Sequence, residues 1–172
     1  YIIDGFLKRK RYKFEIILVN DGSDKKCNKI INKIKKDVNI KLISYKKNMG
    51  KGYAIKTGML NSRGDYRFFT DIDLSVAIEN IDLFLKYVKK FDVIISSRRK
   101  NASSIIEHQP FFRELLGKCY TSISQKFLGL SVSDFTCGFK CFSAEAAKKI
   151  FSNATIHRWG FDSEVIYLAS FF

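Results

Sequence analysis

The hydrophobic residues of this chain fall into short continuous runs that are separated by stretches with helical spacing. A run of about four to eight apolar residues, bounded by turn-forming residues, is typical of a strand buried on both faces. Four segments have this pattern, and we predict a strand in each: 14–20, 40–45, 65–71 and 91–97.

The stretches between these runs have features of helices. Asp24 is a residue type that caps helices, and the apolar residues after it recur at helical spacing: Ile30, Ile31, Ile34 and Val38. A glycine-rich turn at 48–52 leads into a second predicted helix, and a third is expected near residues 78–90. Strands that alternate with helices predict an α/β fold, a mostly parallel sheet with helices on both faces.

The length of 172 residues and the 46% hydrophobic content predict one globular domain, 1–172, with a real core. The sequence begins at Tyr1 without a methionine and ends at Phe172 within an apolar, helix-like stretch, so we expect a fragment. No run of about 18 apolar residues occurs, so we expect no membrane-spanning helix in this sequence.

The net charge of +14 predicts attraction to an anionic partner. Candidates are a nucleotide, a phosphorylated substrate, an acidic membrane surface or nucleic acid, and composition does not choose among them. Many of the lysines are expected simply to solvate helix faces. The four cysteines lack the spacing of a zinc site and are interpreted as reduced thiols: Cys27, Cys119, Cys137 and Cys141.

Polar residues follow the predicted strands at their carboxyl ends. In open α/β sheets, ligands bind beyond these ends. The sequence therefore predicts one cleft that is lined by Asp21, Asp71, Asp73, Ser97 and Arg98.

Asp71 and Asp73 are the strongest metal candidates. In extended backbone, side chains two residues apart point the same way, so both carboxylates should face the cleft while Ile72 points into the core. Two adjacent carboxylates repel unless a cation lies near them, and Mg²⁺ or Mn²⁺ is often held by one or two carboxylates and substrate phosphates. Such a pair also occurs in solvated loops, but the apolar strand before it favours a site.

Two loops are candidates for nucleotide binding. In the turn after the first strand, Asp21 either serves turn geometry or accepts a hydrogen bond from a base. In the glycine-rich loop, Gly50 and Gly52 either serve packing or let the backbone approach a phosphate, with Lys51 adding charge. The loop matches neither a P-loop nor a GxGxxG fingerprint.

Longer motifs resemble a known family. "EIILVNDGSDKK", "NMGKGYAIKTGM" and "FTDIDLS" occur in the order found in family 2 glycosyltransferases, which have the GT-A fold. "SSRRK", "FFRELLGKCY", "DFTCGFKCFSAEAAKKIF" and "HRWGFDSEVIYLASFF" narrow the resemblance to the dolichyl-phosphate β-glucosyltransferases, relatives of dolichyl-phosphate mannose synthase. The similarity extends from about residue 14 to 172. The first strand of the family with its "PxxNE"-like motif, the membrane anchor and C-terminal elements are expected to be absent.

The resemblance implies an inverting enzyme that depends on Mg²⁺ or Mn²⁺. Such an enzyme transfers glucose from UDP-glucose to dolichyl phosphate, giving dolichyl β-D-glucosyl phosphate for protein N-glycosylation. It acts at the cytosolic face of the endoplasmic reticulum membrane. One alternative is a related polyprenyl-phosphate glycosyltransferase that uses another sugar, such as mannose. The other is a basic module that binds nucleic acid; the scattered lysines and the lack of a nucleic-acid motif argue against that partner.

The resemblance also assigns residues to the donor side. It implies that Asp21 touches the uracil, that Gly50 and Lys51 line the nucleotide, that Asp71 faces the sugar and nucleotide, and that Asp73, with Asp71, binds the metal. We place four more residues with the donor: Gly22 and Ser23 in the same turn as Asp21, and Asp162 and Glu164, which match the family's "FDxE".

On the acceptor side, Arg98 and Arg113 match the arginines that bind the acceptor phosphate in the mannose-synthase relatives, and Asp134 matches a proposed catalytic carboxylate. A phosphate monoester has a second pKa of about 6, so it needs positioning more than a strong base. We therefore expect Asp134 to tune the arginines or the acceptor. The arginines could otherwise form surface ion pairs.

Two expectations concern apolar residues. The stretch 111–130 is either a core helix or an interfacial helix with its apolar face toward a membrane, and the family context favours the second. Trp159, Phe161 and Tyr167 are interpreted as packing residues.

Overall fold

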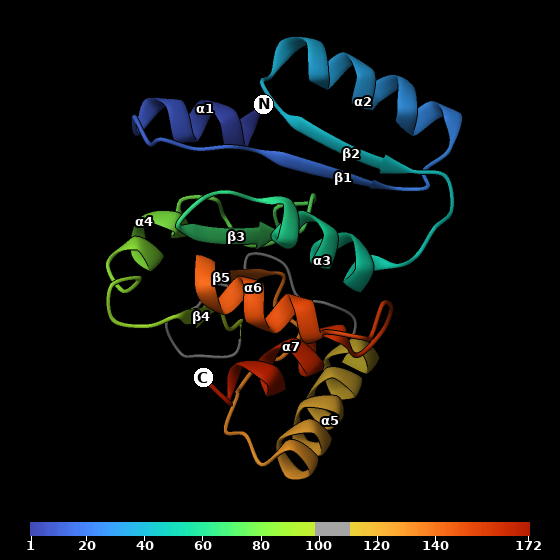
Figure 1. Ribbon diagram of the computed structural model, residues 1–172. Coiled ribbons are helices and arrows are strands. Elements are labelled where there is room, and N and C mark those ends of the chain that lie inside the picture. Colours follow the sequence, from blue (N-terminus) through green and yellow to red (C-terminus); the bar gives the residue numbers. More distant parts are fainter. Residues whose placement is uncertain (99–110) are drawn as a thin grey trace.

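The computed structural model describes residues 1–98 and 111–172, with side chains for all of these except 111–114. Figure 1 shows the chain as layers of helices around short strands. In chain order the elements are α1 (Ile2–Arg9), β1 (Ile17–Asp21), α2 (Lys25–Asp37), β2 (Lys41–Tyr45), α3 (Lys51–Asn61), β3 (Tyr66–Thr70), α4 (Asn80–Leu85), β4 (Val93–Ile95), α5 (Phe111–Leu128), β5 (Phe139–Ser143), α6 (Ala144–Asn153) and α7 (Phe161–Ala169).

The strands form two hydrogen-bonded groups. β1 and β2 pair in parallel, and β5 lies between β3 and β4 and runs antiparallel to both. The predicted α/β fold is confirmed, and each of the four predicted strands is present and shorter than predicted, with β1 ending one residue later, at Asp21. The expected sheet was mostly parallel, whereas β5 makes this one mixed. β5 was not predicted, because Gly138 and Lys140 interrupt the apolar run that would have marked it.

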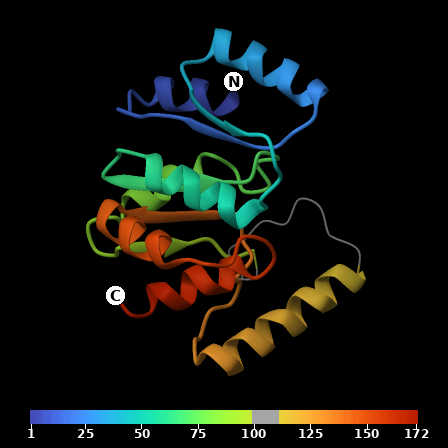
Figure 2. The same cartoon turned by 45° about the vertical axis from the view of Figure 1, so that its right-hand side comes forward.

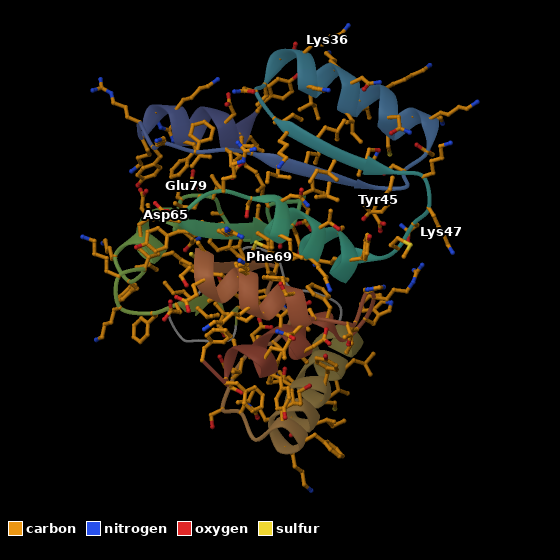
Figure 3. The ribbon with its side chains drawn as sticks, in the orientation of Figure 1. Lys36, Tyr45, Lys47, Asp65, Phe69 and Glu79 are labelled. Atoms are coloured by element: carbon orange, nitrogen blue, oxygen red, sulfur yellow. The ribbon has the colours of Figure 1, made fainter. Side chains whose placement is uncertain are left out.

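Helices cover both faces of the three-stranded group. Alternate residues of β5 point to opposite faces, so Phe139 and Cys141 join a core with α1 and α4, whereas Phe142 joins a core with α3, α6 and α7. β3 divides its side chains in the same way, with Phe68 on the first side and Phe69 on the second. Figure 3 labels Phe69 beside α6, which belongs to the same core. β5 is therefore the centre of the hydrophobic structure.

α2 begins where the sequence predicts. The Asp24 carboxylate accepts a hydrogen bond from the backbone N–H of Cys27 at 2.8 Å, which satisfies one of the free donors of the first turn. The helix nevertheless buries none of its residues, and Ile30 is exposed to solvent. The helical spacing was correct, but the apolar stripe is covered less than its pattern predicts.

α5 lies at the edge of the molecule, and Figure 2 shows it standing away from the remaining helices. Polar residues make its contacts with the body: Tyr120 and Ser163 share a hydrogen bond of 2.6 Å between their hydroxyls, and Thr121 and Ser124 are buried. Away from these contacts, α5 exposes four large apolar side chains: Leu115, Leu116, Ile123 and Phe127. Within the described residues, no helix combines the length and apolar character needed to cross a bilayer.

Candidate functional site

Several predicted site residues lie at or just after the carboxyl ends of strands: Asp21 at the end of β1, Asp71 and Asp73 after β3, and Arg98 after β4. The arrows of β1, β2 and β3 all point toward the right side of Figure 1. Tyr45 and Lys47, at and just after the end of β2, lie on that side in Figure 3. Ligands of α/β proteins bind at this edge, so the location agrees with the expectation from sequence.

Asp21 joins the end of β1 to the start of α3. Its two carboxylate oxygens accept hydrogen bonds from the backbone N–H groups of Met49 and Gly50, at 2.7 and 2.9 Å. A carboxylate is favourable there because the free N–H groups of a helix start carry partial positive charge. Gly50 has a φ of +103°, which is strained for any residue with a side chain. The structure thus brings Asp21 together with Gly50 and Lys51, as predicted.

The glycines of this loop pack against another part of the chain. A Cβ atom at Gly50 would lie 2.6 Å from the carbonyl oxygen of His157, and one at Gly52 would lie 2.5 Å from that of Ile156. Tyr53 donates its backbone N–H to the same His157 oxygen at 3.1 Å. Residues 156–158 therefore fill the space that the missing side chains of these glycines leave open. Their contact with a phosphate stays a prediction.

Asp71 follows β3 and is held from two sides. Lys51 Nζ lies 2.6 Å from Asp71 Oδ1. On the other side, a Cβ atom at Gly138 would lie only 2.0 Å from Asp71 Oδ2, so the carboxylate fills the space that a side chain at 138 would need. The Asp71 backbone N–H also donates to the Gly138 carbonyl oxygen at 3.1 Å. Residue 138 therefore fixes both the backbone and the side chain of Asp71.

Ile72 differs from the prediction. It is 87% exposed, whereas the alternation of an extended strand placed it in the core. β3 ends at Thr70, and residues 72–73 form a turn in which the Leu74 N–H donates to the Asp71 carbonyl oxygen at 3.1 Å. Strand alternation does not continue through a turn, so the residue between the two aspartates points outward.

Asp73 is an exposed carboxylate in that turn. Its Oδ1 accepts the backbone N–H of Ser75 at 3.0 Å, which leaves Oδ2 without a hydrogen-bond partner among the described residues. In the same part of the chain, no group of three or more acidic, histidine or cysteine side chains gathers as a metal site. An ion of the Mg²⁺ type is commonly held by one or two carboxylates together with substrate phosphates, and a metal site at Asp71 and Asp73 stays a prediction.

Arg98 and Asp134 form a two-point ion pair. Arg98 Nε lies 2.9 Å from Asp134 Oδ2, and Nη2 lies 3.1 Å from Oδ1. Asp134 is 1% exposed, and Thr136 donates its backbone N–H and hydroxyl to Oδ1 as well. The hydrogen bond to Asp134 raises the pKa of the Arg98 guanidinium further, so that it stays charged. The expected contact between Asp134 and an acceptor-side arginine is present. The side chain of Arg113, the second predicted arginine, lies outside the described residues.

Lys140 is a buried cation that the sequence analysis did not single out. Its Nζ donates to Asp162 Oδ1 at 2.5 Å and to the Cys137 carbonyl oxygen at 2.7 Å, and it lies 5.1 Å from the centre of the Phe69 ring. Burial raises the pKa of Asp162, and the charge of Lys140 opposes that shift. The sequence signal for this residue is a single lysine inside an otherwise apolar strand, which indicates a buried ion pair.

The acidic residues of the "FDSE" motif form hydrogen bonds with other parts of the chain. Glu164 accepts the backbone N–H groups of Thr155 and Ile156, at 2.8 and 2.9 Å, and thereby fixes the segment that packs on α3. Phe161 is buried, as predicted. Trp159 is 97% exposed, so its interpretation as a packing residue was wrong. It lies in a turn before α7, between Arg158 and Gly160.

Comparison with known proteins identifies the family of this chain. Residues 2–151 match glycosyl transferase family 2. The chain belongs to this family. It is 32% identical, over 95% of its length, to a dolichyl-phosphate beta-glucosyltransferase of Trichomonas vaginalis, of which it covers 54%. It is 33% identical, over 94% of its length, to the enzyme of that name from Dictyostelium discoideum, and 29% identical, over 94%, to the human one, covering 52% and 53% of these relatives. The chain thus spans about half the length of the curated relatives it matches.

Proposed function

We propose that this chain is the catalytic part of an enzyme that transfers glucose from UDP-glucose to dolichyl phosphate with inversion. One observation carries the proposal: the segment Asp134–Lys140 contacts both Asp71, on the expected donor side, and Arg98, on the expected acceptor side. The relatives at about 30% identity are named as dolichyl-phosphate beta-glucosyltransferases, and these names support glucose as the transferred group and dolichyl phosphate as the acceptor.

On the donor side, Asp71 and Asp73 would hold Mg²⁺ or Mn²⁺. When bound, the ion supplies positive charge that neutralises the departing diphosphate. Lys51, 2.6 Å from Asp71, adds a further cation beside the same position. Asp21, which fixes the loop 49–50 through its carboxylate, would contact the base from the neighbouring strand end.

On the acceptor side, Arg98 would bind the lipid phosphate. Its Nε and Nη2 face Asp134 and Thr136, and Nη1 has no partner among the described residues, so donors remain for a phosphate oxygen. The phosphate is already ionised near neutral pH and attacks without a strong base. Asp134 therefore serves to hold the arginine in position rather than to take a proton.

The membrane would lie against α5. Its exposed apolar residues are flanked by Lys118 and Lys126, which are exposed as well. An apolar helix face bordered by lysines is the pattern of a helix that lies in the surface of an anionic membrane. This arrangement would bring a lipid-linked acceptor to the site at the cytosolic face of the endoplasmic reticulum.

Calorimetric binding of UDP with and without Mn²⁺ tests the proposal. We expect binding that requires the ion and that Asp73→Asn weakens about tenfold or more, because one carboxylate ligand is lost while Asn can still accept the Ser75 N–H. Glu145→Gln, on the exposed face of α6, is the matched control. Binding that is independent of the ion and falls steeply with salt would instead indicate a polyanion-binding module. Preference for GDP-mannose over UDP-glucose would point to a related enzyme for another sugar.

A further inference from the structure

The segment Asp134–Lys140 contacts three ion pairs. Asp134 pairs with Arg98, and Lys140 pairs with Asp162. Between them, Gly138 lies against Asp71, which pairs with Lys51. One short stretch of backbone therefore determines where the donor-side carboxylate and the acceptor-side guanidinium lie.

Lys140 anchors this stretch from within the core. Its side chain is fully buried, and its Nζ is held between Asp162, the Phe69 ring and the Cys137 carbonyl oxygen. A buried ammonium group is stable only when it is paired and hydrogen-bonded, so these contacts fix its position. The bond of 2.7 Å to the Cys137 carbonyl oxygen in turn fixes the peptide group that joins Cys137 to Gly138.

Gly138 passes this constraint to Asp71. The Gly138 carbonyl oxygen accepts the Asp71 N–H at 3.1 Å, and the Gly138 Cα side faces the Asp71 carboxylate with no room for a Cβ atom. Any movement of the Cys137–Gly138 peptide group therefore moves Gly138 and, with it, the Asp71 carboxylate that lies against it.

We propose that Lys140 is a positioning residue for glycosyl transfer, acting through the Cys137 carbonyl group and Gly138 on the Asp71 carboxylate. Asp162 supplies the countercharge that allows a lysine at this depth. The inference rests on the proposed function, because the position of Asp71 affects transfer only if the donor binds beside it.

The test compares the wild-type chain with the double variant Lys140→Met/Asp162→Asn, because loss of Asp162 alone would leave the Lys140 ammonium buried without its countercharge. The double variant removes both charges of the pair, and Met keeps a long side chain that packs well against the Phe69 ring. The first readout is hydrogen exchange of the Asp71 N–H without any ligand. The second is UDP affinity in the presence of Mn²⁺. The N–H groups of Met49 and Gly50, which are held by Asp21, serve as internal references for exchange.

We expect Asp71 exchange to be about tenfold faster in the double variant than in the wild-type chain, and UDP to bind about 10- to 100-fold more weakly, the usual effect of losing a residue that orients a ligand-binding group. The reference N–H groups should not change. Thermal unfolding checks that each variant folds. If the double variant does not unfold cooperatively, Lys140→Met/Asp162→Leu replaces it, because apolar replacement of a buried ion pair often preserves stability.

The two readouts separate the inference from the proposed function. Equal Asp71 exchange in the two compared proteins would overturn the positioning role, whatever the enzyme binds. Faster exchange in the double variant, together with a wild-type chain that binds no UDP, would support the positioning of Asp71 by Lys140 and overturn the proposed function.

Discussion

Asp71 and Gly138 occupy a shared space: the carboxylate of one stands where the other would carry a side chain, 2.0 Å from an ideal Cβ position. This contact links the end of β3 to the turn before β5. Because the Asp71 N–H also bonds to the Gly138 carbonyl oxygen, the two residues form a rigid corner. The requirement for glycine at 138 arises from the neighbouring carboxylate, not from its backbone angles, since its φ is not in the left-handed region.

Gly138→Ala should therefore damage donor binding. The added methyl group displaces the Asp71 carboxylate, and a shift of about 1 Å in a catalytic group costs on the order of 100-fold in activity. The measurement is the rate of glucose transfer at subsaturating UDP-glucose. Gly5→Ala is the control. Gly5 lies within α1, and a Cβ atom added there would meet no other atom within 4 Å. Near-normal transfer by Gly138→Ala would contradict this prediction, because it would show that the Asp71 carboxylate can move away from residue 138 without loss of activity.

Asp134→Asn should weaken the use of the acceptor. The Asn side chain has one oxygen in place of the two that receive Arg98 Nε and Nη2, so the guanidinium loses its fixed orientation. We expect the KM for a short-chain dolichyl phosphate to rise about tenfold or more, with a smaller change in the KM for UDP-glucose. Arg98→Lys should act similarly because an ammonium group cannot form the same two-point pair. An unchanged acceptor KM in Asp134→Asn would contradict the role of this pair.

Cys141 should make the fold sensitive to alkali. Burial raises the pKa of its thiol from 9.0 to about 12, so the folded chain keeps the proton while the unfolded chain loses it above pH 9. The unfolded state then binds fewer protons, and stability falls as pH rises between these values. At pH 10 the loss from this thiol is about 1.4 kcal/mol. Urea unfolding at pH 8.5 and pH 10 measures it, and Cys141→Ala should show a smaller decrease. Equal decreases in both proteins would argue against a protonated, buried thiol.

Phe127→Glu should reduce membrane binding. Phe127 is 82% exposed on the apolar face of α5, and burying a phenylalanine contributes about 1.5–3 kcal/mol, so its loss corresponds to tenfold weaker binding or more. Co-sedimentation with vesicles that contain anionic lipid is the measurement. Lys149→Gln, an exposed change on α6 that lowers the net charge by the same single unit, is the control. If both variants lose binding to the same extent, charge alone governs attachment and the apolar face does not.

The sequence predicted well wherever a short apolar run ended in a polar residue. Asp21, Asp71 and Arg98 all lie close to strand ends, and the strands before them are present. Such runs are governed by local patterning, which the sequence displays directly. The contact between Arg98 and Asp134 was also expected, although it came from the family resemblance and not from spacing.

The failures arise where tertiary contacts override local pattern. β5 contains a lysine that only a distant carboxylate, Asp162, makes acceptable in the core, and that partner is not visible from the strand itself. Ile72 was placed inside because the strand was extended past Thr70, where the chain turns instead. The packing of residues 156–158 against Gly50 and Gly52 was also not visible in the sequence, because that segment lies far along the chain; the approach of a phosphate to these glycines stays a prediction.

The two hydrogen-bonded groups of strands meet without a shared ladder in the described part of the chain, and Asp21 belongs to one while Asp71 belongs to the other. Three consecutive residues connect the two groups. Met49 and Gly50 donate their backbone N–H groups to Asp21, and Lys51 forms an ion pair with Asp71. Sliding of one strand group along the other would thus strain residues 49–51, which set the spacing between the two aspartates.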